Sequence, residues 1–208
     1  MIRSYFLAAV FVALAPFALA ARDEKPVAST EPKDVPLELK LVADQADWEL
    51  DSRGDPSFKF QEKIRAGEKS GEPVSATRVN LELEIKNTGK QPLRIWVSGD
   101  ATLLSLDLTG PGAMTAAAKL TPPTGVDPPH SVTLAPGKSY KIPLSSLAYG
   151  FRLSATHAYI TETGDYQLSA TFKTGVSPAP PNSKGLTLGF GEVTLKSAPI
   201  AFFVKRPS

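Results

Sequence analysis

The sequence predicts an all-β protein, an antiparallel sandwich of about seven to nine strands with long loops and at most one or two short helices. Three observations lead to this prediction. Apolar and polar residues alternate over several short segments, turn residues separate these segments, and there is almost no helical periodicity. The chain has 208 residues with 19 prolines, 15 glycines and no cysteine, so its core has to form without disulfides.

The N-terminal part of the domain is predicted to be a strand followed by an irregular insertion. Leucines alternate with other residues from Leu37 to Leu41, as in a strand with one buried face. The insertion covers about residues 44–77. Asp55 and Pro56 predict a short helix over 56–66 that would cover one end of the core, with Asp55 as cap and Gly67 at its end. The alternative is a loop with a short strand around Phe58.

Two hairpins are predicted in the middle of the chain. The clearest alternation runs from Val79 to Lys86 and is followed by Asn87-Thr88-Gly89, which favours a turn because Asn and Gly tolerate positive φ. Alternation resumes after Pro92. Later, Pro136-Gly137 suits the centre of a type II turn between strand segments at 132–134 and 140–144.

The remaining strands are predicted from the same alternation. One covers 104–108, and a proline-containing loop over 113–131 follows it. Another begins after Gly164 and contains Tyr166 and Leu168. A proline-rich loop over 176–184 precedes strand material that extends from 186 to 204.

The first twenty residues predict export from the cytoplasm. Arg3 precedes an apolar run that ends in Ala18-Leu19-Ala20, a pattern typical of a signal peptide cleaved between Ala20 and Ala21. The alternative is an uncleaved N-terminal anchor. A flexible leader over 21–35 and a single domain over 36–205 would follow, and the protein would be periplasmic or secreted.

The order of these motifs resembles a known group of proteins. Lys86-Asn87-Thr88-Gly89, the segment from Leu134 to Tyr140 that contains Pro136-Gly137, and Gly164-Asp165-Tyr166-Gln167-Leu168 occur in this order. Together they resemble secreted bacterial immunoglobulin-like β-sandwich modules and, more weakly, the domain of the bacterial intracellular proteinase inhibitor family. The resemblance covers about residues 78–204 and implies an immunoglobulin-like fold.

The strand that begins at Gly164 has the pattern of a tyrosine corner. Tyr166 lies at the start of the strand and two residues before Leu168, so its hydroxyl is expected to bond to a nearby backbone group. Leu168 takes the place that an antibody domain gives to its second cysteine. We therefore expect an aliphatic centre in which Leu83 or Ile85 packs against Leu168.

Composition and motifs argue against several functional classes. The formal net charge of +2 is too small to suggest a nucleic-acid-binding protein. The sequence contains no nucleophile elbow, phosphate-binding loop or zinc-protease motif. Its two histidines, His130 and His157, lack the spacing of metal ligands. We expect no catalytic residue, metal or cofactor.

Trp96 is the most prominent candidate for binding. If its neighbours Ile95 and Val97 face the core, Trp96 points outward together with Arg94 and Ser98. An exposed indole beside an arginine could stack on a sugar or anchor a protein. The alternative is that a loop such as 113–129 covers it, or that Trp96 is itself a core residue.

The sequence therefore favours a non-enzymatic binding or structural module that contacts an unidentified extracytoplasmic protein. A protease inhibitor is the alternative, based on the motif order alone. A carbohydrate-binding module that uses Trp96 is a further alternative.

Overall fold

The computed structural model describes residues 35–118, 125–151 and 154–207, and the structural statements below refer to these residues. All of the described residues belong to one compact unit of the chain. The predicted signal segment, its cleavage site between Ala20 and Ala21 and nearly all of the predicted leader lie outside the described residues.

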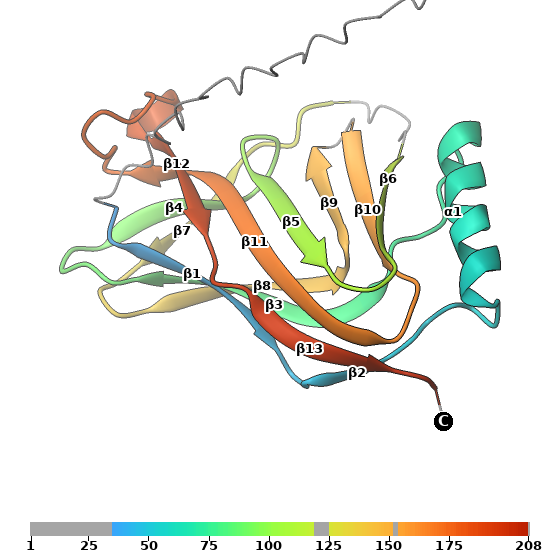
Figure 1. Ribbon diagram of the computed structural model, residues 1–208. Helices are drawn as coiled ribbons and strands as arrows, with labels where there is room; N and C mark the ends of the chain where they lie inside the picture. Colours follow the sequence, from blue (N-terminus) through green and yellow to red (C-terminus); the bar gives the residue numbers. More distant parts are fainter. Residues whose placement is uncertain (1–34, 119–124, 152–153, 208) are drawn as a thin grey trace, which may run out of the picture. The chain divides into compact units, whose positions relative to one another are not determined.

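The described residues form mainly β-strands, which confirms the predicted all-β class (Figure 1). The strands outnumber those expected, because elements as short as β2 and β9 show no recognisable alternation. The elements are β1 (Leu37–Ala43), β2 (Asp47–Glu49), α1 (Ser57–Ser70), β3 (Arg78–Asn87), β4 (Leu93–Ser98), β5 (Leu103–Thr109), β6 (Ala113–Ala118), β7 (His130–Leu134), β8 (Ser139–Ser146), β9 (Ala148–Phe151), β10 (Ser154–Ile160), β11 (Gly164–Ser177), the 3-10 turn η1 (Thr187–Gly189), β12 (Gly191–Lys196) and β13 (Ile200–Lys205).

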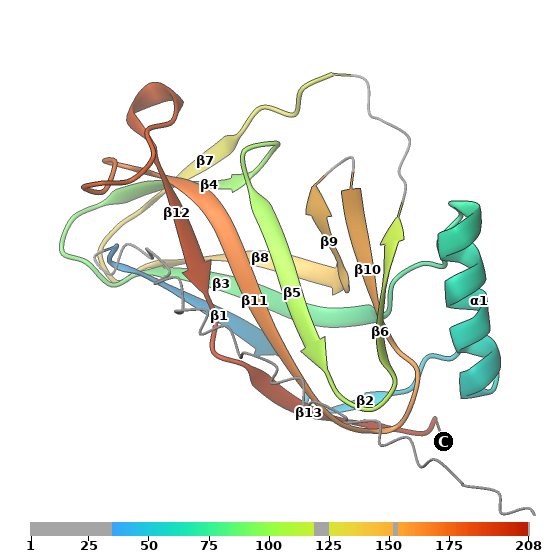
Figure 2. The same cartoon turned by 45° about the horizontal axis from the view of Figure 1, so that its top comes forward.

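Two sheets form the immunoglobulin-like sandwich. One has the strand order β1-β3-β8, and the other has the order β13-β11-β4-β7, extended at one edge by β2. This division matches the two sheets of an immunoglobulin domain, in which the second and third strands lie in opposite sheets. The long strand β11 also pairs with β12 and β5, so it runs through most of the second sheet (Figures 1 and 2).

Both predicted hairpins are wrong, because each turn crosses between the two sheets. β3 pairs with β1 and β8, whereas β4 pairs with β7 and β11. In the same way, β7 pairs with β4 and β8 pairs with β3. The turn residues are as expected: Gly137 has φ 72°, and the Lys138 amide donates to the Ala135 carbonyl at 3.0 Å. The two turns therefore form adjacent arches over one end of the sandwich.

Asn87 joins the two arches. Its side-chain amide donates to the carbonyls of Gln91 (2.8 Å) and Leu134 (2.9 Å), and its side-chain oxygen accepts from the Gly89 amide at 2.9 Å. Its backbone N–H donates to Lys138, and its carbonyl accepts from Gly137. Asn87 is fully buried, so these bonds satisfy polar groups that water cannot reach.

Gly89 lies so close to Pro36 that position 89 has no room for a side chain. A Cβ at this position would lie 2.9 Å from the side chain of Pro36, which is closer than a methyl group allows. The neighbouring Thr88 amide donates to the Pro36 carbonyl at 2.9 Å. The segment that enters β1 is thus held against the first arch.

The main core lies between the two sheets and is aliphatic at its centre, as predicted. Leu83, Ile85 and Leu168 have no exposed surface and belong to one cluster of buried residues. Trp48 also belongs to this cluster. Its ring stacks on Phe202 with centroids 4.0 Å apart.

A smaller layer flanks the sandwich. It consists of the sheet β6-β10-β9 and α1, whose buried residues Phe60 and Ile64 pack with Ala116 and Tyr159. The Glu68 carboxylate accepts from the Ala117 amide at 3.1 Å, so α1 also satisfies part of the free edge of β6.

The predicted helix is confirmed, but its boundaries differ. Pro56 is the N-cap residue, and Asp55 forms an ion pair with Lys63 (2.5 Å) instead of capping the helix. The helix continues past Gly67, which packs against backbone atoms of the segment 72–74, and ends at Gly71 with φ 80°. The predicted end at Gly67 is therefore wrong, and the helix is one turn longer than predicted.

The predicted tyrosine corner is confirmed. The Tyr166 hydroxyl lies between the carbonyls of Glu162, at 2.8 Å, and Pro111, and donates to these acceptors. Its ring covers Gly110, where a Cβ would lie 2.3 Å from the ring. Gly164 has φ 143° and also lies against Pro111. Tyr166 therefore connects the turn before β11 to the turn after β5.

Replacing Asn87 by alanine should lower the free energy of unfolding by about 3 kcal/mol, because two carbonyls lose their donors in a site without water. Asn87→Asp should be more damaging at neutral pH than in acid, because its charge would face the same carbonyls. Urea denaturation measures both effects. The control is Asn80→Ala, on the exposed side of the same strand; equal losses for Asn80→Ala and Asn87→Ala would contradict this role of Asn87.

Tyr166 should make the fold sensitive to alkali. Burial raises its pKa from 10.0 to about 12. Between these values the unfolded chain loses the phenol proton and the folded chain keeps it, so the free energy of unfolding decreases as the pH rises. Urea denaturation between pH 10 and pH 12 measures this. The free energy of unfolding should decrease less steeply with pH in Tyr166→Phe than in the unchanged chain. Equal slopes would contradict the assignment.

Candidate functional site

Trp96 does not form an exposed binding surface. Its side chain is 3% exposed, although its neighbours Ile95 and Val97 do face the main core as expected. The indole lies on the other face of β4, and a separate part of the chain covers it. The prediction that Trp96 offers its ring to a sugar or a partner is therefore wrong.

The covering segment is the loop between β11 and β12, and not the segment 113–129 considered from the sequence. Phe190 of this loop stacks on Trp96 with centroids 4.7 Å apart and planes inclined by 22°. The Arg94 guanidinium lies 5.4 Å from the Phe190 ring centre. On β11, Gly175 leaves room for the indole, since a Cβ there would lie 2.5 Å from it. Trp96 and Arg94 thus come together as the support of a loop.

Ser98, the third predicted binding residue, lies apart from this stack. Its exposed side chain is at the end of β4 and lines a separate hollow of about 240 Å³ together with Phe151 and residues of the β4–β5 turn. The three candidate residues therefore do not form one site.

The loop supported by Trp96, residues 178–190, is held closed by its own backbone. The Leu186 amide donates to the Phe190 carbonyl at 2.7 Å, and the Glu192 amide donates to the Lys184 carbonyl at 2.9 Å. At its tip, Leu188 is 85% exposed and adopts φ 59°, a left-handed conformation that is uncommon for leucine. The loop thus displays an apolar side chain on a braced backbone.

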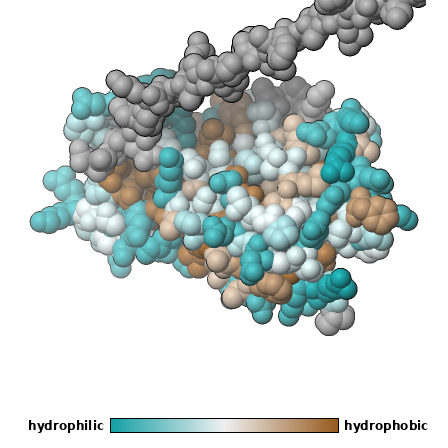
Figure 3. Space-filling model, viewed as in Figure 1, coloured by the Kyte–Doolittle hydropathy of each residue, from teal (hydrophilic) through white to brown (hydrophobic). Residues whose placement is uncertain are grey.

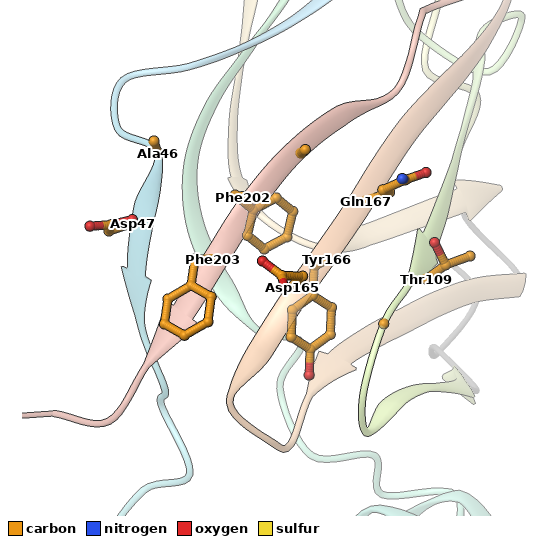
Figure 4. A pocket seen from close by; sticks show the side chains of 10 residues that line it. Ala46, Asp47, Thr109, Asp165, Tyr166, Gln167, Phe202 and Phe203 are labelled. Atoms are coloured by element: carbon orange, nitrogen blue, oxygen red, sulfur yellow. The ribbon is translucent and has the colours of Figure 1, made fainter.

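A groove of about 700 Å³ lies on the second sheet (Figure 4). Residues of β2, β13 and β11 and the end of β5 line it. Figure 3 shows a mostly hydrophilic to neutral surface on this side of the molecule, with small hydrophobic patches near β13 and β2. We call this hollow the β13 groove.

One row of side chains defines the β13 groove. Phe203 on β13 pairs with Asp165 on β11 and with Asp47 on β2, so the aromatic ring stands between two carboxylates on three adjacent strands (Figure 4). The Phe203 side chain is 43% exposed. The next row contains Ala201, Gln167 and Thr109, and the small alanine leaves the hollow beside the ring.

A stack of aromatic rings supports the groove from below. Phe202 faces the core, where it lies between Trp48 and Tyr166, with ring centroids 4.0 Å and 5.7 Å from its own. These three residues are buried. The backbone of the groove is therefore fixed by packing before any ligand arrives.

The polar groups of the groove are free to bind a ligand. Among the described residues, the side chains of Asp47, Asp165 and Gln167 have no hydrogen-bond or ion-pair partner. An ionised carboxylate only accepts hydrogen bonds, and the face of a phenyl ring carries negative partial charge. Each of the three side chains in this row therefore attracts positive charge: Asp47, Phe203 and Asp165.

No metal-binding cluster of three or more His, Asp or Glu residues occurs in the part of the chain that the structure describes. The His157 ring lies 2.9 Å from the Val74 carbonyl, and His130 is exposed at the start of β7 in another sheet. Within the same residues, no helix is long and apolar enough to cross a membrane.

Sequence reasoning did not identify the β13 groove. Its residues come from four segments that are far apart in the chain, and their adjacency depends on the parallel pairing of β2 with β13. The one available signal was Phe203 beside Phe202 in an alternating strand, because only one of two adjacent residues can face the core.

Comparisons with known proteins do not assign this chain to a family. No protein-family model and no curated protein matches this chain. Among solved structures, Escherichia coli alpha-2-macroglobulin in its native conformation is similar at 15% identity and a TM-score of 0.33, over 82% of this chain and 7% of that chain. PapD-like domain 7 of human CEP192, an ASH/PapD-like domain, is similar at 13% identity and a TM-score of 0.25, over 93% of this chain and 99% of that chain. The fold assignment rests on the strand pairing described above.

Proposed function

We propose that this chain is a non-enzymatic binding module that holds a lysine or arginine side chain of a protein partner in the β13 groove. The observation that supports this most is the row in which the exposed Phe203 ring stands between the free carboxylates of Asp47 and Asp165. The proposal extends the interaction module expected from the sequence and replaces Trp96 with a different surface.

The chemistry of the groove selects for a cation with an aliphatic stem. Adjacent strands lie about 4.8 Å apart, so the two aspartates are about 10 Å apart across Phe203. A guanidinium or ammonium group attracted to the ring face remains within reach of a carboxylate on either side. The hollow beside Phe203, above Ala201, takes the stem of the side chain, while Gln167 and Thr109 supply further polar contacts.

A protein ligand fits this groove better than a sugar. Both flanking groups are charged acceptors, and a neutral sugar would not balance their charge. A basic side chain provides several N–H donors and the opposite charge. Inhibition of proteases remains a prediction from the motif order.

The export signal predicted for residues 1–20 supports an extracytoplasmic partner. The leucine-rich core and the absence of cysteine allow the module to keep its fold in either redox environment. The proposed partner is therefore an extracytoplasmic protein with an exposed basic segment.

A short arginine peptide tests the groove directly. Titration of the purified chain with triarginine amide, followed by NMR, should shift the amides of β13 and the start of β11. The dissociation constant should rise with salt because the contact is electrostatic. Asp165→Asn and Phe203→Ala should each weaken binding by roughly fivefold to tenfold, since each removes about 1 kcal/mol.

The matched control is Asp107→Asn, which removes an exposed carboxylate from the same sheet outside the groove. It should leave the affinity for triarginine amide almost unchanged. Stronger shifts at the same residues with a neutral trisaccharide would instead support carbohydrate binding. Triarginine binding that Asp165→Asn and Phe203→Ala leave intact would refute the proposal.

A further inference from the structure

The same chain carries a loop with one lysine, no acidic residue and an exposed apolar tip, which complements the β13 groove. We infer that the loop over residues 178–190 of one copy occupies the β13 groove of a second copy, so that copies join head to tail. This inference rests on the proposed function of the groove and names one occupant for it. Its support comes from the charge, the rigidity and the position of the loop.

The charges of the two surfaces are opposite. Between Pro178 and Phe190 the loop contains Lys184 and no acidic residue, and Arg94 lies against its Phe190 ring. The next carboxylate along the chain, Glu192, is paired with Lys173 at 3.0 Å. The groove, by contrast, contains two carboxylates and no basic residue among those that line it.

The apolar parts of the two surfaces also correspond. Leu188 is 85% exposed at the tip of the loop, and Phe203 is the exposed aromatic residue of the groove. Ala201 leaves space beside the Phe203 ring. We place the Leu188 side chain in this space, with Lys184 directed to Asp47 or Asp165. The contact then combines an apolar anchor with an ion pair at its rim.

The loop is already ordered in the single chain, which lowers the entropic cost of association. Hydrogen bonds close it at Leu186–Phe190 and Lys184–Glu192, and the Ser183 hydroxyl donates to the Pro180 carbonyl at 2.7 Å. Phe190 anchors the loop on the buried Trp96. This arrangement gives Trp96 a role in binding although its own ring is covered.

The position of the two surfaces excludes a contact within one copy. Asp165 lies at the first residues of β11, whereas the loop begins where β11 ends at Ser177 (Figure 2). Twelve residues of extended strand span about 40 Å. The loop must therefore reach another copy. Because the two surfaces differ, the contact is heterologous and can extend into a row of copies rather than close a symmetric dimer.

Sedimentation velocity of the purified chain tests this inference. The mean mass should rise with concentration at low salt and return to that of the single chain near 0.5 M salt, where the Debye length is about 4 Å. Two variants should each weaken association at least tenfold. Leu188→Asp damages the loop, and the double variant Asp47→Lys with Asp165→Lys damages the groove.

Mixing these two variants separates a head-to-tail contact from other modes of association. Each variant keeps one intact surface. The mixture should therefore form pairs, and no assembly larger than a pair. The control is Phe58→Asp, which changes an exposed apolar residue on α1 and should associate like the unchanged chain.

A chain that stays single at millimolar concentration and low salt would overturn self-association. If the same chain still binds triarginine amide at Phe203, the groove function stands and only its occupant is wrong. Association that persists in both damaged variants, or a mixture that stays unpaired, would likewise overturn the inference.

Discussion

The sandwich depends on the buried amide of Asn87, which fixes how its two sheets are connected. The arch from β3 to β4 and the arch from β7 to β8 both leave one sheet and enter the other, and the Asn87 side chain bonds to both. Only Asn and Gln side chains offer two donors and an acceptor in one planar amide, and Asn holds that amide on the shorter stem. An antibody domain also has a disulfide between its sheets, but this chain has no cysteine. Here the aliphatic core and the Asn87 amide together hold the two sheets.

The fixed arches determine where the two proposed binding surfaces lie. They place β4 beside the end of β11, so that Trp96 can receive Phe190 and support the loop over residues 178–190. At the other end of β11, the hydroxyl of Tyr166 fixes the entering turn, and its ring completes the stack beneath the β13 groove. The two surfaces are therefore separated by the length of one rigid strand.

The fold class, the tyrosine corner and the aliphatic centre could be predicted from the sequence because each depends on a local pattern. Alternation shows which residues share a face, and Gly or Pro shows where a strand stops. The pairing of strands could not be predicted in the same way. A turn at Asn87-Thr88-Gly89 or at Pro136-Gly137 has the same residues in a hairpin and in an arch, and only the distant contact from Asn87 to Leu134 separates the two. The direction of Trp96 was also predictable, whereas the ring of Phe190 that covers it comes from almost a hundred residues later.

The charges of the β13 groove support the proposed binding of a basic side chain. Elsewhere this protein places opposite charges on adjacent strands, as in Lys141–Glu82 at 2.5 Å and Lys173–Glu192 at 3.0 Å. A lysine at position 203 would form an ion pair of the same kind with Asp47 or Asp165, because cross-strand pairs of opposite charge are favourable. The chain instead has a half-exposed phenylalanine there, which leaves both carboxylates unpaired and an apolar ring in water. A cationic group on an aliphatic stem would pair with a carboxylate and cover the Phe203 ring at the same time.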